Sequence, residues 1–159
     1  MTTSPDRIAA IDAEEAALAL TRFTNDDAWW LGTRLREMAL ERDASVAIVI
    51  RRGAATLFQA VLDGATADNV AWALRKLAVV THFERSSYAT ALHMRARGAT
   101  FERYGLDDKA YACAGGAVPI RISGVGMVGG AAVSGLPEEQ DHALVVAVLR
   151  ELVWNRSER

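Results

Sequence analysis

The chain has 159 residues, 51% of them hydrophobic and 24% charged, with a formal net charge of −2 at pH 7. A chain of this size builds one ordinary domain with its own core, and its hydrophobicity excludes a disordered protein. The charge lacks the basic excess of a nucleic-acid binder, so we expect no nucleic-acid partner. Cys113 is the only cysteine, which excludes a disulfide within one chain and fits a reducing, cytoplasmic protein.

The first part of the chain is predicted to be a partly helical extension over residues 1–22, with a short and poorly anchored helix at 12–20. It carries acidic residues and no long apolar stretch, so it resembles neither a secretory signal nor a membrane anchor. We therefore expect no membrane partner. A single domain is expected over 23–154, followed by a tail at 155–159.

The domain is expected to begin with a helix that Thr24 or Asn25 caps. Two runs of β-branched and aromatic residues follow, at 46–51 and 56–62, and a turn at Gly53 joins them into a β-hairpin. Alternating positions on both faces of these strands are apolar. Other layers must therefore cover the sheet on both sides.

Two helices are predicted next, the first over 69–83 and the second ending at Gly98. Ser86 or Ser87 is expected to cap the start of the second helix. A loop-rich stretch with one short helical turn then leads into the next strands.

Gly124, Gly126 and Gly129 form a G-x-G-x-x-G pattern, the spacing of a dinucleotide-binding loop. Such a loop needs its glycines between a strand and a helix. Here the segment 119–122 is strand-like, and the residues after Gly126 are poor helix formers. We therefore predict a second hairpin that turns at residues 123–126, and no nucleotide cofactor.

Gly129, Gly130 and the two alanines after them leave the strand 127–134 with almost no side-chain bulk. Such a strand permits close approach of another backbone or helix, and alternatively of a flat ligand. Tight helix packing is the favoured explanation. The last helix starts at Pro137 and carries an apolar stripe over 144–152, typical of a core-packing helix.

No catalytic set stands out among the polar residues, so catalysis stays undecided. His82, His93 and His142 are far apart, and none has the spacing of a metal motif. His142 follows Asp141 in the first turns of the last helix, where the positive helix end favours the neutral, metal-ligating imidazole. The alternative is an exposed polar residue near a helix start.

Arg75 and Lys76 fall on the expected polar face of the 69–83 helix, where they can hold a propionate, phosphate or carboxylate. The alternative for this pair is a solvated helix face. Ser86 and Ser87 are most simply explained as helix caps.

Several segments resemble the haem-degrading-domain family, which includes GlcG and a haem-binding sensor component, and within it a branch of small soluble proteins. The resemblance runs from about Phe23 to Val153. Its most specific marks are Asp68, Asn69, Trp72, Arg75, Lys76, Ser86, Ser87, Gly115, Gly116, Pro119, Val133, Ser134, Gly135, Asp141 and His142.

The resemblance implies an α/β fold of the α+β type: a three-layer α-β-α sandwich whose central antiparallel sheet is built from two β-hairpins. It also implies a homo-oligomer, and haem or iron as the cofactor. His142 is then the candidate ligand of the haem iron. The other candidate ligand-binding residues are Arg75, Lys76, Ser86, Ser87, Gly115, Gly116, Gly129, Gly130 and Asp141.

The leading hypothesis is a haem-binding protein that resembles haem-degrading relatives, with a flat anionic tetrapyrrole lying against strand 127–134. One alternative is a non-catalytic oligomeric assembly or partner-binding module. Adjacent Trp29 and Trp30 favour it, because a helix buries both only when it is covered over a broad arc. Trp154 adds a third large aromatic residue for an interface. A further alternative is an enzyme or binder for a small organic acid.

Overall fold

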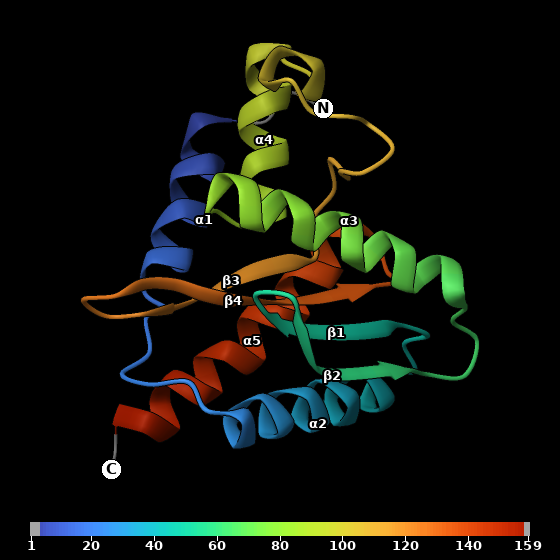
Figure 1. Ribbon diagram of the computed structural model, residues 1–159, viewed down its shortest axis with the longest axis vertical. Coiled ribbons are helices and arrows are strands. Elements are labelled where there is room, and N and C mark those ends of the chain that lie inside the picture. The colour runs from blue at the N-terminus through green and yellow to red at the C-terminus, as the bar shows by residue number, and fades with distance from the viewer. Residues whose placement is uncertain (1–3, 158–159) are drawn as a thin grey trace.

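The computed structural model describes residues 4–157, which form five α-helices, one 3-10 helix and four strands (Figure 1). The elements in chain order are α1 (Pro5–Ala16), α2 (Asn25–Glu41), β1 (Ala47–Arg52), β2 (Ala55–Val61), α3 (Ala67–Phe83), α4 (Ser87–Arg97), η1 (Phe101–Tyr104), β3 (Ala117–Ile122), β4 (Gly126–Ser134) and α5 (Glu138–Ser157).

The strands form one antiparallel sheet in the order β2-β1-β4-β3. Both predicted hairpins are present, and β1 pairs with β4 to join them, with Val49 opposite Ala132. Gly53 and Gly124 lie in the two hairpin turns with φ of 58° and 77°, a left-handed conformation that glycine adopts without strain. The G-x-G-x-x-G segment is therefore a hairpin, as predicted.

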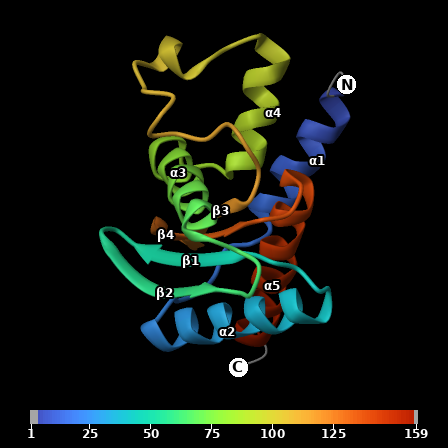
Figure 2. The ribbon, with the colours of Figure 1, turned by 90° about the vertical axis from the view of Figure 1, so that its right-hand side faces the viewer.

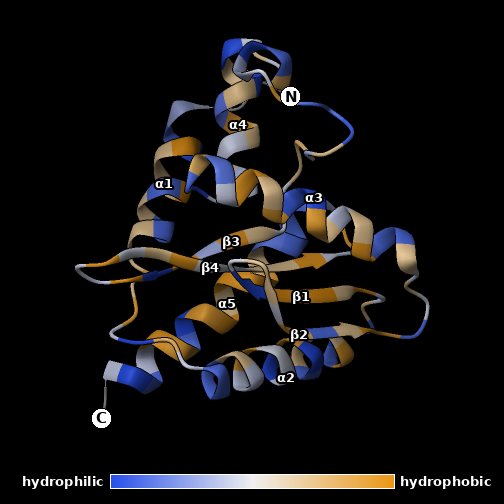
Figure 3. Ribbon diagram, viewed as in Figure 1, coloured by the Kyte–Doolittle hydropathy of each residue, from blue (hydrophilic) through white to orange (hydrophobic). Residues whose placement is uncertain are grey.

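Helices cover both faces of the sheet, which confirms the predicted sandwich of the α+β type. Helices α2 and α5 lie on one face and α3 lies on the other (Figures 1 and 2). The larger part of the core lies between the sheet and the α2–α5 layer and includes Leu31, Leu35, Ile48, Ile50 and Leu149. Figure 3 shows the labelled body of β1 as hydrophobic, and its first four residues are buried, as expected for a strand covered on both faces.

Local capping sets the ends of several helices. The Thr24 hydroxyl accepts a hydrogen bond from the Asp27 amide at 3.1 Å, and the Asp27 carboxylate accepts one from the Thr24 amide at 2.8 Å. This reciprocal pair is a capping box. Ser86 caps α4 by accepting from the Ala89 amide, and Gly98 ends α4 in the left-handed conformation.

The N-terminal helix differs from the prediction, since it spans Pro5–Ala16 and not 12–20. Ser4 caps the start of this helix. After the helix ends, Leu20 forms a bridge with Ile122. The expectation of poor anchoring is also wrong, because the buried carboxylate of Glu15 accepts a hydrogen bond from the Ser86 amide at 2.9 Å.

The division into an extension, a domain over 23–154 and a tail stays a prediction. Residues 1–3 of the extension and 158–159 of the tail lie outside the described residues. Helix α5 continues to Ser157, so most of the expected tail is helical. Within residues 4–157, no helix is both long enough and apolar enough to cross a membrane.

Candidate functional site

A cavity of about 630 Å³ opens beside α3, over β1 and β4. Its volume falls in the range of about 300–1,000 Å³ that is usual for small-molecule sites. Residues 127–130 of β4, Arg51 and Gly53 at the end of β1, and Tyr111 from the loop before β3 line it. Helix α3 contributes Leu74, Leu77, Ala78, Thr81 and His82.

Gly129 and Gly130 lie in the cavity wall, at positions where neighbouring groups leave no room for a side chain. A Cβ added to Gly129 would lie 2.3 Å from the carbonyl oxygen of Arg51 on the adjacent strand. One added to Gly130 would lie 2.9 Å from Leu77 Cδ2 on α3. The close-packing explanation of these glycines is therefore confirmed.

His82 is the histidine that lines this cavity, and the sequence analysis did not select it. It lies in the last turn of α3 with an exposed ring. Its ring packs edge-on against Phe83 and Tyr111, with centroid distances of 4.8 and 6.0 Å. The signal that could have found it is the helical spacing of residues 74, 77, 78, 81 and 82, which marks one side of α3.

Arg51 is the cation at the cavity. Its Nη2 donates a hydrogen bond to the carbonyl oxygen of Ala54 at 3.0 Å. Its Nε is buried and has no hydrogen-bond partner among the described residues. A guanidinium with a spare N–H is suited to a carboxylate, which accepts two parallel hydrogen bonds from it.

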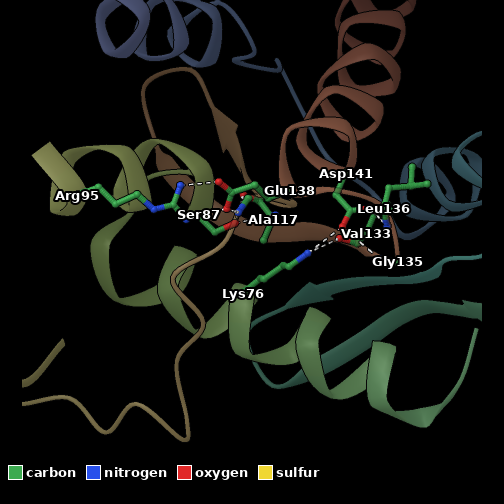
Figure 4. Close-up of polar contacts among 10 residues, drawn as sticks. Lys76, Ser87, Arg95, Ala117, Val133, Gly135, Leu136, Glu138 and Asp141 are labelled. Carbon is green, nitrogen blue, oxygen red and sulfur yellow. Dashed lines mark hydrogen bonds and ion pairs between the residues drawn. The ribbon is translucent and has the colours of Figure 1, made fainter. Parts of the chain in front are cut away.

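Lys76 and Asp141 form a buried ion pair away from the cavity lining (Figure 4). Lys76 Nζ lies 3.0 Å from Asp141 Oδ2 and donates to the Val133 carbonyl oxygen at 3.1 Å. The Asp141 carboxylate also accepts from the amides of Gly135 and Leu136. Burial raises the pKa of Asp141, although Lys76 and these two amides oppose the rise.

The prediction that both members of the Arg75–Lys76 pair face solvent is wrong for Lys76. Its side chain is 4% exposed and passes inward from α3 to α5. Arg75 does lie on the outer side, where its guanidinium carbon stands 4.1 Å from the centre of the Trp72 ring. The two neighbours therefore have different roles, and neither lines the cavity.

The remaining small and hydroxyl residues predicted for the site belong to the packing around this ion pair. The Ser87 hydroxyl accepts from the Ala117 amide at 3.0 Å. A Cβ added to Gly116 would lie 2.7 Å from Lys76 Nζ, and Gly116 has φ of 137°. Gly115 donates its amide hydrogen to Glu138 at 3.2 Å. None of Ser86, Ser87, Gly115, Gly116 and Asp141 lines the cavity.

Glu138 and Arg95 close the same region from α5 and α4 (Figure 4). The two guanidinium nitrogens of Arg95 lie 2.5 and 2.9 Å from the two carboxylate oxygens of Glu138. Burial acts to raise the pKa of Glu138, but Arg95 and the Gly115 amide outweigh it, and the pKa is lowered. This bidentate pair holds the start of α5 against α4.

His142 is buried and is not among the residues that line the cavity. Its ring centroid is 5.0 Å from that of Tyr88, and its Nε2 lies 3.5 Å from Glu14 Oε1. Both ring nitrogens are buried without a hydrogen-bond partner among the described residues. Burial lowers the pKa of His142, so the neutral ring is favoured.

The structure therefore brings only two of the ten predicted ligand residues, Gly129 and Gly130, to the cavity. Among residues 4–157, no group of three or more histidine, cysteine, aspartate or glutamate side chains is placed to hold a metal ion. The cavity instead joins an exposed imidazole, a guanidinium and an apolar wall. This combination suits a flat ligand with carboxylate groups.

The comparisons with known proteins identify the family. Residues 23–150 match the family described as haem degrading protein HbpS-like. A UPF0303 protein of Streptomyces coelicolor is 46% identical over 156 residues, which covers 96% of this chain and 99% of that protein. Among solved structures, the Ybr137w protein is 29% identical with a TM-score of 0.87, and the match covers 98% of this chain and 92% of that one.

A solved complex of PduOC with haem has a similar fold. It has a TM-score of 0.69 and 17% sequence identity, and the match covers 80% of this chain and 93% of that one. The identity is low, so this likeness concerns the fold alone. The family match covers most of the chain, and the match to the Streptomyces coelicolor relative covers nearly the full length of both proteins. The chain therefore belongs to the HbpS-like family of haem-degrading proteins.

Proposed function

We propose that this protein binds haem, or a closely related flat anionic tetrapyrrole, in the cavity between α3 and the sheet. The observation that carries the proposal is the exposed imidazole of His82 in the lining of a cavity that also holds the guanidinium of Arg51. Imidazole is a common axial ligand of haem iron, and the volume of the cavity is in the range of small-molecule sites.

In this proposal His82 takes the role that the sequence analysis gave to His142. A haem iron must reach a ring nitrogen of its ligand, and His142 is 3% exposed behind Tyr88. Iron could reach His142 only if α1 or α4 moved. His82 needs no such movement, because its ring already stands at the cavity.

Arg51 supports the anionic part of the ligand. Its guanidinium lies in the cavity lining, and a guanidinium can donate hydrogen bonds to a propionate. Leu74, Leu77 and Met127 supply apolar contact for the ring. Haem degradation is a further step that the family's description supports, and it needs a reductant and dioxygen from outside the protein.

A haem titration of the purified protein, followed at the Soret band, tests this proposal. We expect saturable binding, a dissociation constant raised at least about tenfold in His82→Ala, and a shifted Soret band in that variant. His93→Ala is the matched control, because His93 pairs with Asp12 at 2.9 Å and does not line the cavity. It should change the affinity by less than about twofold.

Two results would overturn the assignment. Featureless, non-saturating absorbance changes from the wild-type protein would remove haem as the ligand. Loss of binding in His142→Phe, with His82→Ala unaffected, would restore the ligand that the sequence analysis selected and exclude this cavity. Adding a reductant to the haem complex in air then tests turnover separately, since ring opening abolishes the Soret band.

A small organic acid is the second candidate ligand, and the guanidinium of Arg51 in the cavity lining favours it. A carboxylate present at 100 times its dissociation constant would stabilise the fold by about 2.7 kcal/mol. For a domain of this size, that corresponds to a rise in melting temperature of roughly 5–10 °C. A thermal-shift series with carboxylates, compared with Arg51→Gln, distinguishes this candidate from haem. We also propose a cytoplasmic location, which the single cysteine supports.

A further inference from the structure

Tyr111 lies beside His82 in the lining of the cavity, and the proposed function gives it no role. It belongs to the loop between η1 and β3, whereas His82 lies in the last turn of α3. The centroids of the two rings are 6.0 Å apart and the ring planes meet at 79°, an edge-on arrangement. Aromatic pairs attract one another at centroid distances of about 4.5–7 Å, so the two rings are in contact.

An imidazole that binds iron needs a fixed orientation, because each ring nitrogen reaches a metal in one direction only. In most metal sites the second ring nitrogen supplies it, by a hydrogen bond to a carboxylate, a carbonyl or a water. The contacts of the His82 ring are aromatic instead: Phe83 lies 4.8 Å away and Tyr111 6.0 Å away, both edge-on. These two rings are therefore the groups that can hold the imidazole.

Phe83 and Tyr111 restrain the imidazole in different ways. Phe83 is the next residue of α3, so its contact with His82 is made within one helical turn. Tyr111 reaches the imidazole from a separate segment of the chain, and its contact forms only when the loop packs on α3. The Tyr111 ring excludes every rotamer of His82 that would occupy the same space.

Tyr111 is itself held in place. Its ring centroid is 5.8 Å from that of Phe101, which is buried, and it packs against the apolar cluster around Phe101. The following residue, Ala112, donates its amide hydrogen to the carbonyl oxygen of Arg75 on α3 at 3.3 Å. The loop is therefore attached to the same helix that carries His82, and Tyr111 is a fixed support for the imidazole.

We propose that Tyr111 is a positioning residue, which holds the imidazole of His82 in the orientation that it presents to the cavity. The inference rests on the proposed function, in which His82 is the ligand of the iron. An exposed histidine loses rotamer freedom when it binds a metal, and a ring that is already held loses less of it. Tyr111 therefore raises the affinity for haem through His82.

Three variants separate this role from others. The contact is made between two rings, so Tyr111→Phe keeps it and Tyr111→Ala removes it. Tyr104→Ala is the matched control, because Tyr104 packs edge-on against Phe83 at 5.1 Å and does not line the cavity. Circular dichroism establishes that each variant is folded.

The orientation of His82 is measured first, by NMR spectroscopy on haem-free protein. The χ1 couplings of His82 should report one dominant rotamer in the wild type and in Tyr111→Phe. In Tyr111→Ala they should report an average over several rotamers. Tyr104→Ala should keep the wild-type couplings.

Haem affinity is measured second. Tyr111→Ala should raise the dissociation constant about 2–10-fold, as expected when one side chain must give up its rotamer freedom on binding. Tyr111→Phe and Tyr104→Ala should change it by less than about twofold. In a His82→Ala background, Tyr111→Ala should have no further effect, because a positioning residue acts only through the residue that it positions.

The outcomes distinguish the positioning role from the proposed function. A wild-type chain that binds no haem would overturn both. If His82→Ala weakens haem binding, unchanged couplings or unchanged affinity in Tyr111→Ala would overturn the positioning role alone. Equal losses from Tyr111→Ala with and without His82 would overturn it too, since Tyr111 would then contact the ligand itself. A Tyr111→Phe variant as weak as Tyr111→Ala would assign the effect to the hydroxyl group and have the same consequence.

Discussion

Replacing Lys76 by methionine is expected to destabilise the protein strongly, while the same change at Arg75 is nearly neutral. Methionine fills much of the space of the lysine stem but carries no charge. In Lys76→Met the Asp141 carboxylate keeps its hydrogen bonds from Gly135 and Leu136 and loses its cation. Its side chain is 1% exposed, so water cannot replace the ammonium group.

The magnitude follows from this burial. Removing one partner of a buried ion pair costs about 3–5 kcal/mol, because the other charge stays buried alone. For a domain of about this size, that lowers the melting temperature by roughly 6–20 °C. Arg75→Met removes only a cation–π contact with Trp72 on the surface, which is worth about 0.5–1 kcal/mol.

The loss in Lys76→Met should also depend on pH. Burial already raises the pKa of Asp141, and removing Lys76 takes away a group that lowers it. In the unfolded chain an aspartate ionises near pH 3.9. Between that pH and the higher pKa of the folded variant, the folded state binds more protons, so its stability falls as the pH rises. The cost of Lys76→Met is therefore smaller at pH 4.5 than at pH 7.5.

Urea unfolding followed by tryptophan fluorescence measures these differences, at one fixed protein concentration for all variants. A double variant, Lys76→Met with Asp141→Asn, completes the cycle, since asparagine is neutral and keeps an oxygen that accepts from one of the two amides. We expect it to be more stable than the sum of the single changes by about 1–3 kcal/mol. A cost of Lys76→Met below about 1 kcal/mol, or one that is equal at both pH values, would refute the reasoning.

Two further changes probe the backbone and the buried histidine. Gly116→Ala should destabilise the protein clearly more than Gly124→Ala, because the Cβ of an alanine at 116 would lie 2.4 Å from the Val133 carbonyl oxygen. An alanine at 124 would meet open space, so its cost is only about 1 kcal/mol of backbone strain. Equal losses in urea unfolding would contradict this. Since burial lowers the pKa of His142, its contribution to stability is present above about pH 6.5 and is lost as the pH falls below that value. His142→Leu should flatten the pH dependence of unfolding between pH 7 and 5, and an unchanged slope would contradict the assignment.

Local signals in the sequence predicted most of the secondary structure. The cap at Thr24, the cap at Ser86 and the end of α4 at Gly98 all act within one helical turn, so neighbouring residues suffice to identify them. The hairpin turn at residues 123–126 likewise depends on its own glycines. The sheet with helices on both faces followed from strands that are apolar on both sides.

Arg75 and Lys76 illustrate where local reasoning ends. Both are long cations at adjacent helical positions, and the sequence predicts the same solvated face for both. Lys76 turns inward because Asp141, 65 residues away, offers a buried carboxylate within reach of its stem. The extent of α1 has a similar cause, since Glu15 and Leu20 bind partners in α4 and β3 that only the folded chain supplies.

The two hairpins and the helices that cover the sheet could be predicted from periodicity and capping, which are properties of neighbouring residues. The family could be predicted because several segments resemble its members. Which histidine lines a cavity became clear only from the folded chain. His82 and His142 both lie on helices beside predicted site residues, yet one ring is exposed against Tyr111 and the other is buried against Tyr88. That difference depends on how three elements pack together: α3, β4 and the loop that precedes β3. The spacing of residues along the chain does not predict this packing.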